Sequence, residues 1–144
     1  MEQRLSLVTL GVEDLQRAVA FYEGVLGWKI AASPPGVVFF DLNGVILALW
    51  PHRDLAQDMN AAPGTTPAYP GYSLAHNVGS IEEVDAIFAT VKRHGAKIDK
   101  PPAKTSWGGY SGYFSDPDGH RWEIAHNPHW TILKDGRIWM KRDG

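Results

Sequence analysis

The sequence predicts an α+β protein built from two tandem βαβββ modules, the first at about residues 5–55 and the second at about residues 71–127. Each half begins with a short apolar run typical of a strand and continues into an amphipathic helix that ends at a glycine. The residues after these glycines also match, because GWKI at 27–30 corresponds to GAKI at 95–98. Internal duplication constrains the architecture, so we expect two curled mixed sheets that enclose a cleft and carry helices on their outer faces.

In the first module, the run LSLVTLGV at 5–12 predicts a strand with apolar residues on both faces. Residues 13–26 predict a helix, because apolar side chains recur at spacings of three and four and Gly27 follows as a C-terminal stop. Asn43 and Gly44 form the signal for a tight hairpin turn. The other strands expected in this module are residues 29–32, 37–42 and 45–50.

The second module repeats this order. Residues 72–78 predict a strand, and Ser80 with Glu83 three residues later forms a capping box at the start of a helix that Gly95 ends. The sequence DPDG at 116–119 predicts a turn, because proline fixes its backbone angle, aspartate bonds nearby amides and glycine accepts a positive φ. The segments on either side are therefore expected as the two strands of a hairpin, residues 109–115 and 121–126.

Proline and glycine also mark the connections. The stretch at about residues 56–70 predicts a linker between the modules, and Pro101 with Pro102 predicts a turn. The tail at residues 128–144 has Asp135 and Gly136 between two short apolar runs, which predicts either a small hairpin at a dimer interface or a frayed terminus. We expect residues 1–144 to form a single domain.

Composition excludes several function classes. The net charge of −2 gives no broad basic field for nucleic acid, so no nucleic-acid partner is expected. The absence of cysteine excludes disulfides, thiolate nucleophiles and sulfur-ligated metals. The first residues, MEQRLSLVTL, lack the pattern of a secretory leader and no apolar run approaches bilayer length, so a cytoplasmic protein without a membrane partner is expected.

Two segments carry a resemblance to a known family. The sequence FYEGVLGWKI at 21–30 and the sequence SDPDGHRWEI at 115–124, placed in a repeated βαβββ plan, resemble the vicinal oxygen chelate superfamily. That superfamily includes glyoxalase I, bleomycin-resistance proteins and extradiol dioxygenases, so the resemblance implies a ligand cleft and a homodimer. If the chain is an enzyme, the resemblance implies a lyase, an isomerase or a dioxygenase, because one fold hosts several chemistries.

The metal site of this superfamily is poorly matched. Its members bind a divalent ion through His and Glu on the first and last strand of each module. The corresponding positions here are Leu7, the apolar residues 45–50, either Tyr72 or Ser73, and Glu123. Glu123 is the one match, so we expect no metal and no cofactor, and interpret Glu123 as the surviving member of a metal site.

Three histidines leave an alternative open. His52, His76 and His126 would have to rebuild a site for zinc, nickel, manganese or iron. Neighbouring residues of a strand point to opposite faces, so His126 and Glu123 are expected to diverge, and His76 is expected under the second helix.

Glu123 is also the best candidate for catalysis, as a general base or as a hydrogen-bond acceptor for a ligand. The alternative is a structural pair with Arg121 on the same strand face. The aromatic content predicts a flat ligand cleft, although core packing is the alternative for several of these residues. The residues expected to bind a ligand are Glu123, Arg121, Trp107, Tyr110, Trp50 and Tyr72.

The favoured function is therefore the binding of a small organic molecule in an aromatic cleft by a glyoxalase-like homodimer. Two alternatives remain. One is a metal-dependent lyase, isomerase or dioxygenase of the glyoxalase kind. The other is a drug-sequestering protein similar to bleomycin-resistance proteins.

Overall fold

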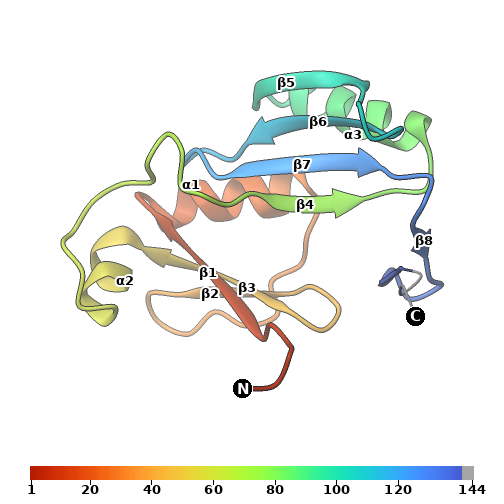
Figure 1. Cartoon of the computed structure of the whole chain (residues 1–144). Coiled ribbons are helices and arrows are strands. Elements are labelled where there is room, and N and C mark those ends of the chain that lie inside the picture. Colours follow the sequence, from red (N-terminus) through yellow and green to blue (C-terminus); the bar gives the residue numbers. More distant parts are fainter. Residues whose placement is uncertain (141–144) are drawn as a thin grey trace. The chain divides into compact units, whose positions relative to one another are not determined.

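The computed structural model describes residues 1–140, which divide into two compact units (Figure 1). The first unit contains residues 1–70 and the turn at 117–120, and the second contains residues 71–116 and the chain from residue 121 onward. Within the described part of the chain, no helix is both long and apolar enough to cross a membrane. The α+β class is confirmed, because each unit combines a mixed sheet with at least one helix.

The first unit is a three-stranded sheet with helices. In chain order its elements are β1 (Leu7–Val12), α1 (Leu15–Val19), the π-helical continuation η1 (Ala20–Val25), β2 (Val38–Asp41), β3 (Ile46–Pro51) and α2 (His52–Asp58). The strand order is β1-β3-β2, with β1 parallel and β2 antiparallel to β3. Asp14 starts α1 by accepting a hydrogen bond from the Arg17 amide at 3.0 Å, as expected of an N-cap.

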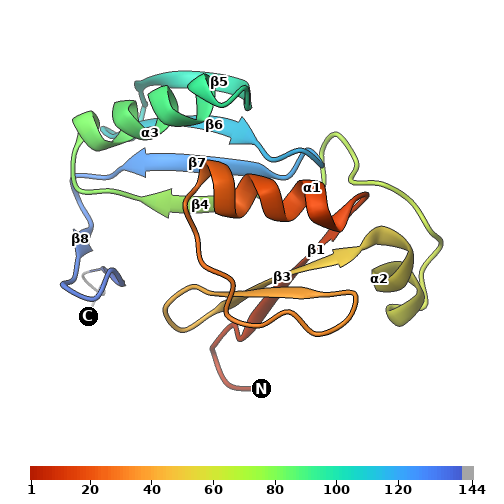
Figure 2. The same ribbon diagram turned by 180° about the vertical axis from the view of Figure 1, so that it is seen from behind.

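The core of the first unit lies between α1–η1 and one face of this sheet. Figure 2 shows the ribbon of α1 and of strands β1 and β3 from behind. The Tyr22 side chain is fully buried, and its ring centroid lies 5.8 Å from that of Phe40 and 5.3 Å from that of Trp28. Burial of aromatic rings in such tilted pairs stabilises the helix on the sheet. The other fully buried large residues of this unit are Leu10, Val12, Leu47 and Leu49.

Two elements of the first unit differ from the prediction. The strand expected at 29–32 is only an isolated bridge between Ala32 and Phe39. The Phe39 carbonyl accepts a hydrogen bond from the Ala31 amide, and the Phe39 amide donates one to the Ala32 carbonyl. The ladder does not continue because Pro34, which has no amide hydrogen, follows soon after. The helix α2 lies where we expected the end of the module and the start of the linker. By contrast, Asn43 and Gly44 both have positive φ values, 61° and 101°, as the predicted tight turn requires.

The second unit is a four-stranded sheet with one long helix. Its elements are β4 (Leu74–Asn77), α3 (Ile81–Arg93), β5 (Lys97–Lys104), β6 (Tyr110–Ser115) and β7 (Arg121–His126), followed by the tail hairpin β8 (Thr131–Ile132) and β9 (Ile138–Trp139). The strand order is β4-β7-β6-β5, with β4 parallel to β7 and the other pairs antiparallel. The tail forms a hairpin, as one of the two alternatives predicted, whereas its place at a dimer interface stays a prediction. Residues 141–144 lie outside the described part.

The helix α3 begins and packs as its sequence predicts. Ser80 accepts a hydrogen bond from the Glu83 amide at 3.2 Å, and the Glu83 carboxylate accepts one from the Gly79 amide at 3.1 Å. On the buried face, the Phe88 ring lies 6.1 Å from that of Phe114 on β6. A Cβ at Gly112 would lie 2.7 Å from the Phe88 ring, so glycine is what allows the helix to approach the sheet this closely.

Pro101 and Pro102 do not form the predicted turn. They lie inside β5, which is the edge strand of the sheet and shifts register twice against β6. An edge strand tolerates proline because its outward amides need no strand partner. The turn prediction was therefore wrong, for a reason that depends on strand order.

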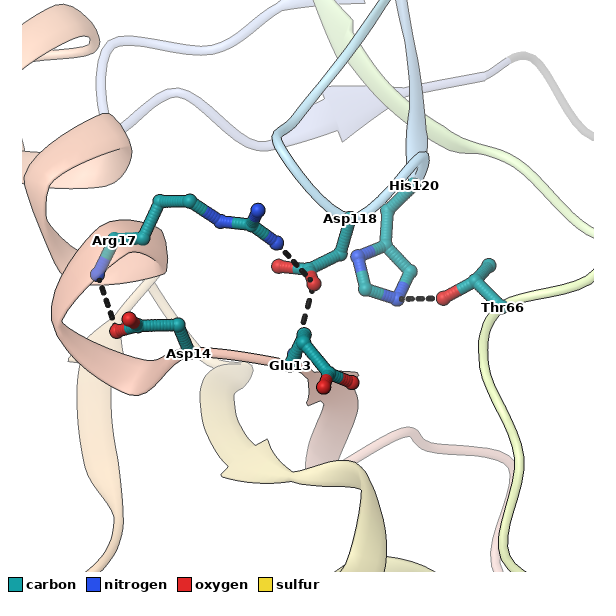
Figure 3. A network of polar contacts seen from close by, with 6 residues as sticks. All are labelled: Glu13, Asp14, Arg17, Thr66, Asp118 and His120. Carbon is teal, nitrogen blue, oxygen red and sulfur yellow. Dashed lines mark hydrogen bonds and ion pairs between the residues drawn. The ribbon is translucent and has the colours of Figure 1, made fainter.

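The DPDG turn is held by a polar network within the first unit (Figure 3). The Asp118 carboxylate accepts hydrogen bonds from the Glu13 amide at 2.8 Å and from the Arg17 guanidinium at 3.1 Å. The ring of His120 is buried and forms a 3.1 Å hydrogen bond with the Thr66 hydroxyl in the linker. The turn therefore connects the linker to the start of α1. Asp118 and His120 both have a structural role in this connection.

Candidate functional site

The face of the second sheet opposite α3 carries the candidate site. Strand alternation on β7 turns Trp122 and Ile124 toward α3, where both are buried, and turns Glu123 the other way. Glu123 pairs across the strands with Tyr113 on one side and with Ala75 on the other. Tyr113 and Glu123 therefore share the face that α3 does not cover, and both side chains are half-buried.

The Tyr113 hydroxyl donates a short hydrogen bond to Oε2 of Glu123. This bond raises the pKa of the Tyr113 phenol, and burial and the charge of Glu123 raise it further, while a hydrogen bond with the Ser73 side chain partly offsets them. Tyr113 thus keeps its proton at neutral pH and remains a donor. Ser73, Tyr113 and Glu123 form a connected polar group, which we call the Glu123 cluster.

Arg121 has a partner other than Glu123. Its Nε lies 3.7 Å from Oδ1 of Asp99, and this oxygen also lies 3.3 Å from Nζ of Lys97. The other carboxylate oxygen, Oδ2, accepts a short hydrogen bond from the Ser115 hydroxyl. The sequence left open a structural pair between Glu123 and Arg121. In the structure, the Glu123 carboxylate instead accepts a hydrogen bond from Tyr113, and Arg121 lies beside Asp99.

Tyr110 lies on the opposite face from Glu123. Its hydroxyl donates a 2.8 Å hydrogen bond to Oδ1 of Asp85 on α3, and this bond is the largest cause of the raised pKa of the phenol. Since a strand residue three positions from Tyr113 points to the other side of the sheet, Tyr110 cannot join the Glu123 cluster. The structure therefore does not bring Tyr110, one of the predicted ligand residues, together with Glu123.

The other predicted ligand residues are exposed or half-buried aromatic side chains. Trp107 is 44% exposed, and its ring covers Gly109 so closely that any Cβ there would overlap it. Tyr72 is 50% exposed, and burial of its hydroxyl, together with the charge of Asp116, raises the pKa of this phenol. Trp50 is the second-last residue of β3 in the first unit and is half-buried.

Within the second unit, His76 and His126 do not lie on the same face of the sheet as Glu123. His76 and His126 both lie on the α3 side of the second sheet, where burial lowers the pKa of His76 and the Nδ1 atom of His126 lies 3.3 Å from the Val78 carbonyl. His52 belongs to the first unit. Among residues 1–140, no three or more His, Cys, Asp or Glu side chains form a group that could hold a metal ion.

Sequence reasoning gave Tyr113 no role beyond lining or core packing. The signal was the DPDG turn itself, because a hairpin that pairs Ser115 with Arg121 must also pair the residues two positions farther along each strand. Those residues are Tyr113 and Glu123. Ser73 was considered only as a failed metal ligand.

Comparison with known proteins gives consistent relatives. The family model described as "Glyoxalase/Bleomycin resistance protein/Dioxygenase superfamily" matches residues 4–124. A glyoxalase-related enzyme from Fulvimarina pelagi has a similar structure, with a TM-score of 0.87 and 35% identity, covering 98% of this chain and 100% of that one.

Two curated relatives share one name, metallothiol transferase FosB. The protein from Lysinibacillus sphaericus is 28% identical over 141 residues, which cover 98% of this chain and 92% of the relative. The protein from Bacillus licheniformis is 32% identical over 116 residues, which cover 78% of this chain and 68% of the relative.

These relatives contradict the expectation that no cofactor is needed, because their name includes a metal. The residues that stand at the superfamily's ligand positions nevertheless do not fit one. Leu7 is an exposed apolar side chain, and β3 carries no side chain that could ligate a metal ion. The Glu123 carboxylate already accepts a hydrogen bond from Tyr113. We therefore assign none of residues 1–140 to a metal.

Proposed function

Because this chain belongs to the glyoxalase/bleomycin resistance protein/dioxygenase superfamily, we propose that it binds a small organic molecule at the Glu123 cluster. The ligand lies on the face of the second sheet that α3 leaves uncovered. It donates a hydrogen bond to Glu123 and contacts the phenol of Tyr113. The observation that carries this proposal is the half-buried carboxylate oriented by a protonated tyrosine.

The hydrogen-bonding capacity of Glu123 supports the proposal. A carboxylate can accept several hydrogen bonds through its two oxygens. Tyr113 bonds Oε2, and the described residues form no other hydrogen bond or ion pair with this carboxylate. Oε1 can therefore accept a hydrogen bond from a hydroxyl, an amine or a thiol. The Tyr113 hydroxyl fixes the carboxylate, so a ligand meets a preorganised acceptor.

Thiol transfer is a second candidate, and the relatives named metallothiol transferase favour it. In such a reaction a thiol loses its proton, and the thiolate sulfur forms a bond to an electrophilic carbon whose leaving group departs with the bonding electron pair. Glu123 would accept the thiol proton. Tyr113 would keep the carboxylate turned toward the sulfur.

Native mass spectrometry of protein purified from cells tests ligand binding. We expect a bound organic molecule on the wild type, and its loss from Glu123→Gln, which keeps the shape of the side chain but removes its charge. Glu82→Gln is the matched control, because Glu82 is an exposed glutamate on α3 of the same unit. Equal occupancy in all three proteins would contradict the proposal.

A thiol-consumption assay separates the second candidate from simple binding. Purified protein is mixed with a low-molecular-weight thiol and an epoxide, with and without added manganese, magnesium or zinc. Thiol loss that depends on Glu123 supports transfer. Ligand binding without thiol loss under any of these conditions leaves the first proposal and rejects the second.

We also propose that the chain forms a homodimer, as its family resemblance suggests. Sedimentation at micromolar concentration measures this directly. A purely monomeric protein that still binds its ligand would reject the dimer and retain the site.

A further inference from the structure

We propose that Asn43 is a site of spontaneous chemical modification, at which the side-chain amide is lost and a mixture of aspartate and isoaspartate forms. The site is the tight turn that joins β2 to β3 in the first unit. It involves no residue of the Glu123 cluster, so it does not rest on the function proposed above.

The reaction needs only the two turn residues and water. The backbone nitrogen of Gly44 attacks Cγ of Asn43, a C–N bond forms, and the side-chain nitrogen leaves as ammonia with the proton that the Gly44 amide gives up. The product is a five-membered succinimide ring. Water then breaks one of the two ring C–N bonds. Breaking the bond at Cγ gives aspartate, and breaking the bond at the backbone carbonyl gives isoaspartate, whose main chain runs through Cβ and Cγ.

The Gly44 amide is available as the nucleophile. Within residues 1–140, no backbone or side-chain acceptor bonds this amide, because the turn is closed instead by the Leu42 amide, which donates to the Val45 carbonyl at 2.8 Å. A Cβ built on Gly44 would meet nothing within 4 Å, so the surrounding space is open to the succinimide ring. Asn43 itself is exposed, so water reaches the ring.

Asn60 is the closest comparison within the chain. It is exposed like Asn43, and these two are the non-glycine residues with a positive φ among residues 1–140, 56° and 61°. The amide that follows Asn60 differs, however, because the Ala61 nitrogen donates a 2.8 Å hydrogen bond to the Ala56 carbonyl. That bond must break before the nitrogen can attack, so exposure and backbone angle alone do not make Asn60 reactive.

The remaining two asparagines lack a usable nucleophile. The amide after Asn77 belongs to Val78, which carries a branched side chain and donates to the Ala125 carbonyl at 2.9 Å. Asn127 precedes Pro128, whose nitrogen has no hydrogen to give up. The structure therefore singles out Asn43 among the four asparagines of the chain.

The two products affect the hairpin differently. Aspartate at position 43 keeps the length of the main chain, and Asp-Gly suits a tight turn as Asn-Gly does. Isoaspartate adds one carbon atom to the main chain between β2 and β3, where the register pairs Asp41 with Ile46, so the turn cannot close in the same register. We expect the isoaspartate form to be less stable than the aspartate form.

Peptide mapping by mass spectrometry tests the site in folded wild-type protein kept at mildly alkaline pH. We expect the amide to be lost from Asn43 at least about tenfold faster than from Asn60, because the competing hydrogen bond of the Ala61 amide must break first. Unfolding in urea should speed the loss from Asn60 and Asn77 more than the loss from Asn43. Equal rates at Asn43 and Asn60 in the folded protein, or loss from Asn43 only in urea, would overturn the proposal.

Two matched variants assign the product. Ion-exchange chromatography should show a more acidic form accumulating in the wild type and in Asn60→Gly but not in Asn43→Gly, since glycine tolerates the positive φ at both positions. Among the separated acidic products, the isoaspartate form should have the lower urea midpoint. An acidic form that accumulates equally in Asn43→Gly, or disappears in Asn60→Gly, would reject the assignment.

Discussion

The bond between Tyr113 and Glu123 can be tested by a double-mutant cycle of Tyr113→Phe and Glu123→Gln. A hydrogen bond to a charged group contributes about 1.5–3 kcal/mol to stability in general. Both side chains are half-buried, and solvent screens the charge, so we expect a coupling free energy of about 1–2 kcal/mol. Urea slopes of about 2 kcal/mol per molar would convert this into a coupling of roughly 0.5–1 M in the unfolding midpoint.

Urea unfolding followed by far-UV circular dichroism measures the four proteins of this cycle. The matched control is a cycle of Tyr110→Phe with Glu123→Gln, because Tyr110 lies on the other face of the sheet and bonds Asp85. Those two changes should add within about 0.5 kcal/mol. A Tyr113–Glu123 coupling no larger than that of the control would refute the arrangement of the site.

Three further predictions concern the scaffold. Asp118→Ala removes the hydrogen-bond acceptor for Arg17 and for a backbone amide, so thermal and urea unfolding should show that the free energy of unfolding falls by about 2–3 kcal/mol. A fall of less than about 0.5 kcal/mol would contradict a stabilising role for the hydrogen bonds shown in Figure 3. Gly112→Ala forces a Cβ within 2.7 Å of a backbone carbonyl oxygen, so it should cost about 1–3 kcal/mol or more in the same assay, and a neutral effect would contradict the close packing of α3. The phenol of Tyr110 should titrate above its ordinary pKa of 10.0 in the wild type and at a lower pH in Asp85→Asn, as measured by phenolate absorbance. The wild type should therefore be more stable than Asp85→Asn below about pH 10, and this difference should disappear as the pH rises through the raised pKa.

Local sequence patterns predicted the elements whose signals are themselves local. The helix α3 begins at the predicted capping serine, and the strand β7 has the predicted bounds, because caps and turn residues act over a few positions. The edge position of β5, which accommodates Pro101 and Pro102, depends on strand order and could not be read from a proline pair alone.

The candidate site was predictable in part. Glu123 was identified by its place after the DPDG turn, and its direction away from α3 followed from strand alternation. Its partner Tyr113 was not predicted, although the register of the hairpin contains the signal for it. The pairing of Tyr110 with Asp85 depends on the position of a helix and could not be predicted from the strands. The expectation of no cofactor was drawn from the residues alone, and the name shared by two relatives contradicts it.

The most direct test of the account is a crystal structure of the protein together with whatever it retains from the cell. We predict electron density for a small organic molecule on the uncovered face of the second sheet, with a donor atom within hydrogen-bond distance of the Glu123 carboxylate. Density for a bound molecule that leaves the Glu123 carboxylate and the Tyr113 hydroxyl untouched would contradict it.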